Sequence, residues 1–269
     1  LKDQSLSLEG LKDNPWLISD YIEEREKCRR CPGLGRCQRS PKGYSLGLEF
    51  VKGKPMEVLR LCRWQKKAAD KYSHRRNYLV CYLSDRQLLN RFENIDTARE
   101  ESRYLAIKDL IEEWNETGNW KGYYLHGDIG AGKTYLMSCL TNRLADQGKK
   151  VAFVNVPAFF ADARNSIGYD DSFVENNLRK MKKAEVLVLD DIGAENATDW
   201  VRDDLLMPLL EYRMENRLPT FFTSNLNPDD LKTHYTYTSS GTDKLKAARI
   251  MERIRTLSYP VSLKGQSRR

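Results

Sequence analysis

The spacing of apolar residues predicts a helix, a hairpin and a second helix in the first 84 positions. Segment 15–28 (PWLISDYIEEREKC) has a helical period and turns four apolar side chains toward one face: Trp16, Leu17, Tyr21 and Ile22. Residues 43–62 are typical of two short strands around a Gly-Lys-Pro turn. Residues 64–84 begin as a basic helical run and end in an apolar segment.

From residue 123 onward, short apolar runs alternate with longer helical patterns. The apolar runs predict buried strands, and they lie at 123–125, 150–156, 186–189 and 219–225. The helical patterns lie at 136–145, 159–184, 200–218 and 243–257. Strands and helices in alternation predict an α/β fold with a parallel sheet.

A glycine-rich stretch joins the first of these strands to its helix. The sequence HGDIGAGKTYL at 126–136 fits the phosphate-loop pattern G-x-x-x-x-G-K-[ST] with no mismatch. The glycines let the backbone fold tightly, so that its N–H groups point at phosphate oxygens, and the helix adds its positive end. We expect Lys133 to reach the β- and γ-phosphates of ATP and Thr134 to ligate Mg²⁺. The expected nucleotide-binding residues are Gly127, Asp128, Ile129, Gly130, Ala131, Gly132, Lys133, Thr134 and Tyr135.

Polar groups follow two of the later strands. Asp190 and Asp191 come directly after four apolar residues, which is the Walker B arrangement. Asp190 is expected to hold Mg²⁺ through water, and Asp191 to orient and deprotonate the attacking water; carboxylates in this position can also cap a helix. Asn225 ends the next strand, where its amide can touch the γ-phosphate or the water, or cap the turn before Pro228.

Four of the six cysteines lie before residue 63. The run CRRCPGLGRC contains a Cys-x2-Cys knuckle and a third thiol, and a fourth follows about 25 residues later. This spacing predicts a structural zinc site formed by Cys28, Cys31, Cys37 and Cys62. The fourth ligand is open, with His74 and Cys81 as alternatives, and unpaired thiols are the other interpretation. Cys139 is most simply a small core residue.

The basic residues are concentrated at the N-terminus. Residues 1–84 contain 18 Lys and Arg against 10 Asp and Glu, whereas residues 85–269 contain 27 against 28. This asymmetry favours two domains with different partners, and we expect them at 1–84 and 96–269 with a linker at 85–95. No apolar run reaches the ~18–20 residues of a membrane span. No signal peptide is apparent, so the expected location is the cytoplasm, without a membrane partner.

Taken together, the phosphate loop, VLVLDDIGAE, FFTSN and IMERIRTL…SLKGQSRR resemble the AAA+ ATPases of the bacterial helicase-loader group, DnaC and DnaI. The cysteine-rich N-terminus is similar to the DnaI type. The resemblance covers essentially the whole chain. It implies a protein that binds the replicative DnaB-type helicase and helps to place its ring on single-stranded DNA during primosome assembly.

The resemblance also assigns roles to single residues. Asn225 is similar to sensor 1, Arg253 to the arginine finger and Arg268 to the sensor 2 arginine. The finger assignment can move to Arg249 or Arg255, and the terminal assignment to Arg269. Asp191 stands where most AAA+ ATPases have Glu. Because Asp is one methylene shorter, we expect slow hydrolysis that suits a switch better than a motor.

Two interaction surfaces follow. An arginine finger acts only if subunits stack head to tail, which predicts ATP-promoted assembly into a ring or an open spiral. Residues 159–183 combine aromatic and basic side chains, which predicts a surface for single-stranded DNA, although aromatics at helical spacing are more often core residues. These side chains are Phe159, Phe160, Tyr169, Phe173, Arg179, Lys180, Lys182 and Lys183.

Three other functions are compatible with parts of the sequence. An IstB-like transposition ATPase has the same nucleotide site, but the cysteine module argues against it. A zinc-dependent adaptor would use ATP only as a conformational switch. A small-molecule kinase would leave the sensor Asn, the finger helix and the terminal arginines without a role.

Overall fold

The computed structural model describes residues 15–51, 54–98, 100–170, 172–239 and 241–268. The chain forms two compact units, one up to Ser73 and one from His74 onward. The predicted boundary at residue 84 differs from this division. The reason is strand β3 (Tyr78–Cys81), which pairs in parallel with β5 (Val151–Asn155) and so belongs to the second unit.

The first unit contains the elements that its apolar pattern predicts. Helix α2 (Pro15–Arg29) is followed by an antiparallel hairpin, β1 (Tyr44–Val51) with β2 (Lys54–Leu61), and by helix α3 (Arg63–Lys71). A short 3-10 turn, Leu34–Arg36, lies between α2 and the hairpin. Few apolar side chains are buried, because the unit is small.

The second unit is built on a parallel sheet of six strands, in the order β10-β4-β7-β6-β5-β3. The remaining strands of this sheet are β4 (Gly122–Gly127), β6 (Val186–Asp190), β7 (Thr220–Ser224) and β10 (Ser258–Leu263). Strands β6 and β7 are buried at every position. Their continuous apolar character therefore reflects a sheet that is covered on both faces.

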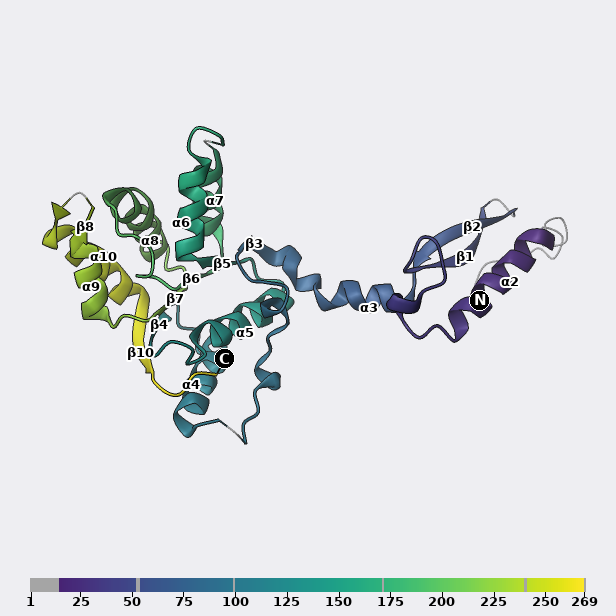
Figure 1. Ribbon diagram of the computed structural model, residues 1–269, viewed down its shortest axis with the longest axis horizontal. Helices are drawn as coiled ribbons and strands as arrows, with labels where there is room; N and C mark the ends of the chain where they lie inside the picture. The colour runs from purple at the N-terminus through teal and green to yellow at the C-terminus, as the bar shows by residue number, and fades with distance from the viewer. Residues whose placement is uncertain (1–14, 52–53, 99, 171, 240, 269) are drawn as a thin grey trace. The chain divides into compact units, whose positions relative to one another are not determined.

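Two layers of helices cover the sheet (Figure 1). One face carries α4 (Ser102–Glu112) and α5 (Lys133–Asp146). The other carries a π-helical turn at Trp200–Leu206 and five helices: α6 (Val156–Ser166), α7 (Ser172–Lys183), α8 (Met207–Glu215), α9 (Pro228–Thr236) and α10 (Lys244–Leu257). A short hairpin whose strands have two residues each, β8 (Tyr237–Thr238) and β9 (Gly241–Thr242), precedes α10. The predicted α/β fold with a parallel sheet is confirmed.

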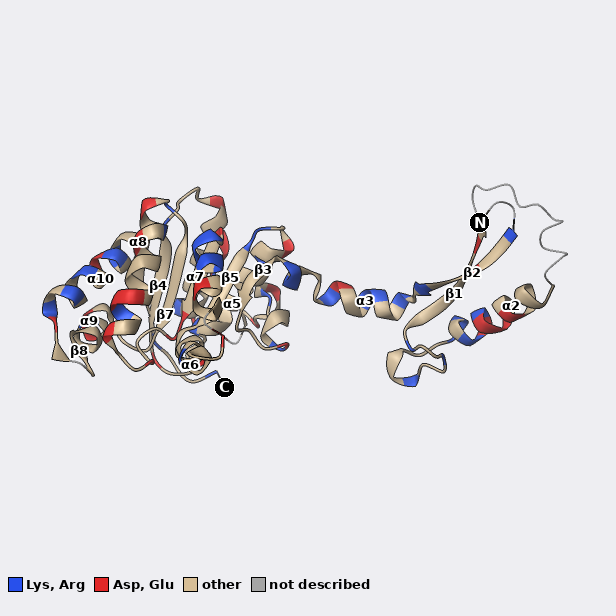
Figure 2. Cartoon of the chain, turned by 90° about the horizontal axis from the view of Figure 1, so that it is seen from above, with Lys and Arg blue, Asp and Glu red and all other residues tan. Residues whose placement is uncertain are grey.

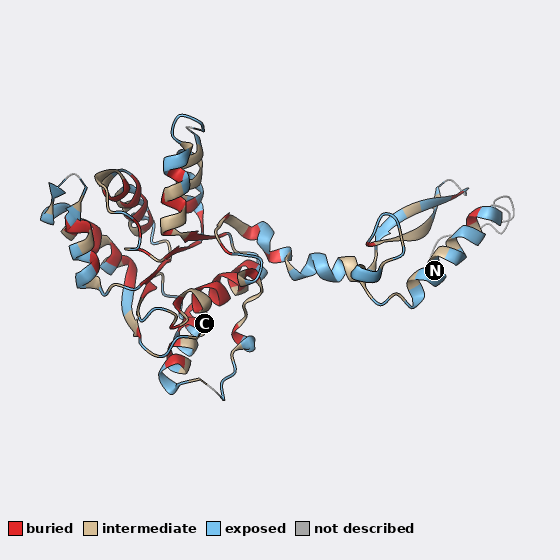
Figure 3. Ribbon diagram, in the orientation of Figure 1, coloured by how far each residue is buried: buried red, intermediate tan, exposed pale blue. Residues whose placement is uncertain are grey.

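The buried residues are concentrated along the sheet and on the helices that cover it (Figure 3). Leu187 and Leu189 of β6 and Val154 of β5 contribute to the core beneath α6, α8 and α10. Side chains two residues apart on a strand share a face, which is why Leu187 and Leu189 lie in the same layer. The core thus fixes the carboxyl ends of neighbouring strands at one edge.

The predicted linker at 85–95 is part of the second unit. It forms two short 3-10 helices, Gln87–Leu89 and Phe92–Asn94, whose Leu88 and Phe92 are buried. The Asn142 side chain of α5 donates to the backbone carbonyls of Gln87 and Asn90. Apolar anchors and these hydrogen bonds hold the segment against α5, so it is an ordered part of the fold.

Candidate nucleotide-binding site

The glycine-rich loop lies between β4 and α5, as its sequence predicts. Gly127, Gly130 and Gly132 have φ of 140°, 82° and 96°, a region that favours glycine. A Cβ atom at Gly127 would lie 2.0 Å from the Leu263 carbonyl oxygen, and one at Gly132 would lie 3.0 Å from the Tyr104 ring. The glycines are therefore required both by backbone conformation and by the close approach of neighbouring segments.

Lys133 links this loop to the end of β7. Its ammonium donates to the carbonyl oxygens of Gly127 and Asp128, at 2.9 and 2.8 Å, and to Asn225 Oδ1 at 2.9 Å. The residue is 5% exposed. The structure thus brings the predicted lysine and the predicted sensor amide into direct contact.

Asp190 lies at the carboxyl end of β6 in a ring of hydrogen-bond donors. Its Oδ1 accepts from the hydroxyls of Thr134 (2.8 Å) and Thr223 (2.7 Å), and its Oδ2 accepts from Asn155 Nδ2 at 3.4 Å. Burial, with the charge of Asp191 as a second cause, raises the pKa of Asp190 to about 6. The hydroxyl and carboxylate oxygens are ligand types that Mg²⁺ prefers.

Asp191 occupies a turn just beyond the strand. It has φ of 57°, which is unusual for a residue with a side chain. Its backbone N–H donates to Thr223 Oγ1 at 2.9 Å, and the side chain lines the same cavity as Lys133 and Asp190. The two predicted carboxylates and the predicted amide of Asn225 therefore converge on one site.

The C-terminal segment closes over the outside of the loop. The Arg268 backbone N–H donates to Gly130 O at 3.0 Å, and its guanidinium donates to Ala131 O at 3.0 Å and to Glu100 Oε2 at 2.7 Å. The same guanidinium stacks 4.0 Å from the centre of the Tyr104 ring. Arg268 thus lines the cavity of its own chain, while the alternative Arg269 lies outside the described residues.

The cavity has a volume of about 880 Å³, within the roughly 300–1,000 Å³ of small-molecule sites. The cavity is also lined by residues with polar side chains that the sequence analysis did not predict, among them Asn90, Asn94, Asp96, Glu100, Tyr104 and Asn155. Most of these belong to the segment that we expected to be a linker or to the turn after it. Only the packing of that segment on α5 could identify them.

The arginines of α10 lie outside this cavity. Lys and Arg gather along this helix (Figure 2). Arg253 pairs with Glu211 at 3.2 Å and with Glu252 at 3.0 Å, and Arg255 pairs with Asp229 at 3.2 Å. Arg249 is exposed. None of the three candidates for the arginine finger therefore lines the nucleotide cavity of its own chain.

The expected stacking surface at 159–183 is smaller than predicted. Phe159 and Phe160 are 2% and 3% exposed, and Phe173 stacks on Phe159 at 6.0 Å between ring centres. Their helical spacing directs the rings of Phe159 and Phe160 into the core, so these two are unavailable to bases, and Phe173 is half-buried against them. Tyr169 is 94% exposed and is the aromatic of this group that faces solvent. Of the basic residues, Arg179, Lys180 and Lys183 are exposed, and Lys182 lies 5.6 Å from the Tyr212 ring centre.

The cysteines of the first unit are only partly gathered. Cys28, Cys31 and Cys62 line one cavity of about 660 Å³, whereas Cys37 is not among its lining residues. The Cys37 thiol has its pKa lowered by backbone N–H groups of Gly43 and Arg39. Among the described residues, no three His, Cys, Asp or Glu side chains meet in metal-binding geometry.

The two alternative zinc ligands belong to the second unit. His74 is buried with its Nδ1 3.5 Å from Asp146 Oδ1, and Cys81 lies in β3. Burial lowers the pKa of His74 and raises that of Cys81. Cys139 is buried in α5, as expected of a core residue.

Fold and site together define an ATP-binding P-loop protein of the AAA+ class. The model of the family of IstB-like ATP binding proteins matches residues 69–269. The chain is 36% identical to the replicative helicase loader DnaI of Bacillus subtilis over 94% of its own length and 81% of the relative's. A crystal structure of DnaI, 38% identical, covers 73% of the chain and 99% of its own with a TM-score of 0.60.

The DnaC helicase loader has the same fold, with a TM-score of 0.54 and 20% identity over 67% of this chain and all of its own. The chain therefore belongs to the IstB-like ATP-binding family and, within it, to the replicative helicase loaders of DnaI type. Among the residues that the structure describes, none of the helices combines the length and apolarity that crossing a bilayer requires.

We predict that Lys133→Ala weakens ATP binding by about 10-fold to 100-fold, because a charge-assisted contact to phosphate is lost. Binding of a fluorescent ATP analogue measures the effect. Lys149→Ala is the matched control, since this half-buried lysine bonds to Asn115 and does not line the nucleotide cavity. Wild-type affinity in Lys133→Ala would contradict the phosphate-loop assignment.

A second prediction concerns the buried carboxylate. The pKa of Asp190 is raised to about 6, so the folded state favours the protonated carboxyl. The stabilisation that protonated Asp190 gives is lost as the pH rises through about 6. Without nucleotide or Mg²⁺, Asp190→Asn should melt about 2–6 °C above the wild type at pH 7.5, and the difference should shrink at pH 5. Mg²⁺-ATP should raise the melting temperature of the wild type but not that of Asp190→Asn. A variant that melts lower at pH 7.5 would show that ionised Asp190 is structurally favourable.

Proposed function

We propose that the chain hydrolyses ATP slowly and uses this cycle to place a replicative DnaB-type helicase ring on single-stranded DNA. The observation that carries the proposal is the extent of the match to the DnaI helicase loader. Its alignment covers 257 residues, more than the second unit contains, so it includes much of the N-terminal unit. An ATPase that shared only the nucleotide site would match the second unit alone.

The residues of the site fit Mg²⁺-ATP. Thr134 and Asp190 would hold the ion, which supplies positive charge at the phosphates. Lys133 would balance the β- and γ-phosphates after exchanging its present carbonyl and amide acceptors for phosphate oxygens. Asp191 would orient and deprotonate the attacking water, and Asn225 would touch the water or the γ-phosphate. The short Asp191 side chain suits a slow rate.

Arg253 would act on the nucleotide of a neighbouring subunit. It lies outside its own cavity, and its guanidinium is paired with Glu211 of α8 and with Glu252 of α10. Completing a second chain's site from this helix requires head-to-tail stacking, so we propose an ATP-promoted ring or open spiral. Arg249 and Arg255 remain alternatives for this role.

The N-terminal unit would bind the helicase. It exposes several large apolar side chains on α2 and on the hairpin: Trp16, Ile22, Val51, Met56, Leu59 and Leu61. Exposed apolar side chains grouped on a small unit are typical of protein interaction sites. The N-terminal part also contains more Lys and Arg than Asp and Glu, which favours an acidic partner surface.

Zinc would stabilise the same unit. Three of the four predicted ligands already line one cavity, and thiolates suit Zn²⁺. Cys37 would complete the tetrahedron after a local rearrangement, since it lies outside that lining. A metal would offset the small apolar core.

Single-stranded DNA would meet the second unit along α7 and the turn that precedes it, since Tyr169 lies in that turn and the basic residues lie near the end of α7. Tyr169 offers an exposed ring for a base, and Arg179, Lys180 and Lys183 offer charge for phosphates. An IstB-like transposition ATPase shares this second unit but leaves the exposed apolar residues of the first unit without a role. The zinc-dependent adaptor, which uses ATP only as a conformational switch, differs from the proposed loader in that it does not hydrolyse ATP.

The function is tested by capture of a DnaB-type helicase on the immobilised full-length chain, with ATP, with ADP and without nucleotide. We expect capture to require the N-terminal apolar residues. The double variant Trp16→Ala, Ile22→Ala should lose about 10-fold in capture and keep wild-type ATP binding. Leu110→Ala, an exposed leucine of α4, is the control. Undiminished capture by the double variant would exclude this helix as the contact.

Metal analysis tests the zinc proposal. Protein purified without chelator should carry about one zinc per chain, and Cys28→Ser should lower this content and the melting temperature of the N-terminal unit. Cys81→Ser is the control and should keep the metal. A zinc-free wild type would refute the proposal, and wild-type zinc content in Cys37→Ser would assign the fourth position to another ligand.

A further inference from the structure

The turn that carries Asp191 needs to be held in place. Asp191 has φ of 57° and Gly193 has φ of 90°. A non-glycine residue in this region is strained, and such a conformation persists only when its surroundings impose it. A Cβ atom at Gly193 would lie 2.7 Å from Leu231 and 2.9 Å from Leu226, so the turn also packs tightly against the segment that begins α9.

Strand β7 holds one side of the turn. The backbone N–H of Asp191 donates to Thr223 Oγ1, and that of Ile192 donates to the Thr223 carbonyl, both at 2.9 Å. The Ser224 hydroxyl donates to the Ile192 carbonyl at 2.6 Å. These contacts fix the first half of the turn. In the second half, the Ala194 N–H donates to the Asp191 carbonyl at 3.1 Å, which closes the turn on itself.

Glu195 holds the other side. Its Oε2 accepts the Gly193 N–H at 2.7 Å, and its Oε1 accepts the Tyr235 hydroxyl at 2.5 Å. Glu195 is 6% exposed and Tyr235 is fully buried. A carboxylate with both oxygens engaged inside the protein ties the turn to α9, because the loss of either donor would leave a buried polar group unsatisfied.

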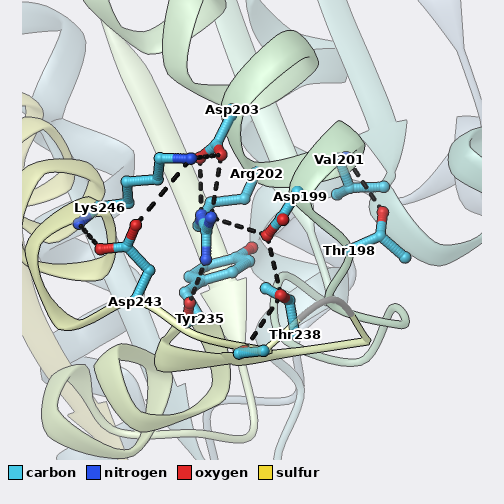
Figure 4. Close-up of polar contacts among 10 residues, drawn as sticks. Thr198, Asp199, Val201, Arg202, Asp203, Tyr235, Thr238, Asp243 and Lys246 are labelled. Atoms are coloured by element: carbon cyan, nitrogen blue, oxygen red, sulfur yellow. Dashed lines mark hydrogen bonds and ion pairs between the residues drawn. The ribbon is translucent and has the colours of Figure 1, made fainter.

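The far end of this contact is itself rigid. Arg202 Nη1 donates to the Tyr235 carbonyl at 3.0 Å. The Arg202 guanidinium is completely buried and is paired with Asp199 at 2.8 Å and with Asp203 at 2.6 Å (Figure 4). Tyr235 is therefore a fixed anchor, and Glu195 transmits that fixed position to Gly193.

We infer that Glu195 is a positioning residue for Asp191. It is not a catalytic residue, since Asp191 lines the nucleotide cavity and Glu195 does not. Without the Glu195 carboxylate, the second half of the turn loses its hydrogen-bonded link to Tyr235, and Asp191 can leave the conformation that aims it at the site. The inference rests on the proposed role of Asp191 in ATP hydrolysis.

The test compares Glu195→Ala, Glu195→Gln and Tyr235→Phe in the full-length chain. Glu195→Ala should lower kcat for ATP by about 10-fold or more, as expected when a reacting group is misplaced, and should change the ATP dissociation constant less than about 2-fold, since the phosphate loop is untouched. Glu195→Gln should recover most of kcat, because its amide oxygen can still accept the Gly193 N–H. Tyr235→Phe should give an intermediate loss. Glu112→Ala, which removes a carboxylate paired with Lys108 and Arg143, is the control.

Hydrogen exchange of residues 191–195 gives a readout that does not depend on turnover. Glu195→Ala should exchange faster there and at wild-type rates in β4 and α5. Unchanged exchange, or a wild-type kcat in Glu195→Ala, would overturn the positioning role. Equal loss of kcat and of ATP affinity would also overturn it, since that pattern indicates general destabilisation. If Glu195→Ala does not fold, Tyr235→Phe decides by the same two readouts. Absence of turnover in the wild type would instead refute the proposed ATPase function.

Discussion

The contact of the Lys133 ammonium with Gly127, Asp128 and Asn225 is the interaction on which the site depends. It ties the phosphate loop to the end of β7, two segments almost a hundred residues apart in the chain. The contact is possible because β4 and β7 are parallel neighbours, so their carboxyl ends meet at one edge. A buried ammonium that donates to these three oxygens would gain a stronger, charged acceptor in a phosphate group.

The two carboxylates in the same cavity, Asp190 and Asp191, require positive charge from a ligand. Asp190 and Asp191 adjoin in a buried site, and their mutual repulsion contributes to the raised pKa of Asp190. The hydroxyls of Thr134 and Thr223 offset part of the cost of ionising it. A divalent cation would offset the rest, so nucleotide and metal are expected to bind together. The C-terminal segment supports the arrangement from outside, because Arg268 is bonded to Gly130 and Ala131.

Local patterns predicted the phosphate loop, the Walker B carboxylates and the order of strands and helices, because each depends on residues close in sequence. Long-range packing decided the rest. Nothing in 85–95 distinguishes a linker from a segment pinned to α5, and Tyr78–Cys81 becomes a sheet strand only by pairing with β5. The sequence leaves both DNA stacking and core packing open for the rings of Phe159 and Phe160, and only their burial in the folded unit decides between them. From the sequence alone, Glu195 is indistinguishable from an ordinary surface acid, because its hydrogen-bond partner Tyr235 lies 40 residues away and no local pattern links the two.

The buried residues that anchor Asp191 also anchor the helix with the finger candidate. Arg202 binds the Tyr235 carbonyl on one side and Asp203 on the other, and Asp203 accepts from Lys246 in the first turn of α10 at 2.8 Å. The same helix carries Arg253. If Asp191 acts on its own nucleotide and Arg253 on a neighbour's, the two groups share one support. A displacement of the turn around a chain's own nucleotide would therefore alter what α10 presents to the next subunit, which gives hydrolysis in an assembly a physical route for acting between subunits.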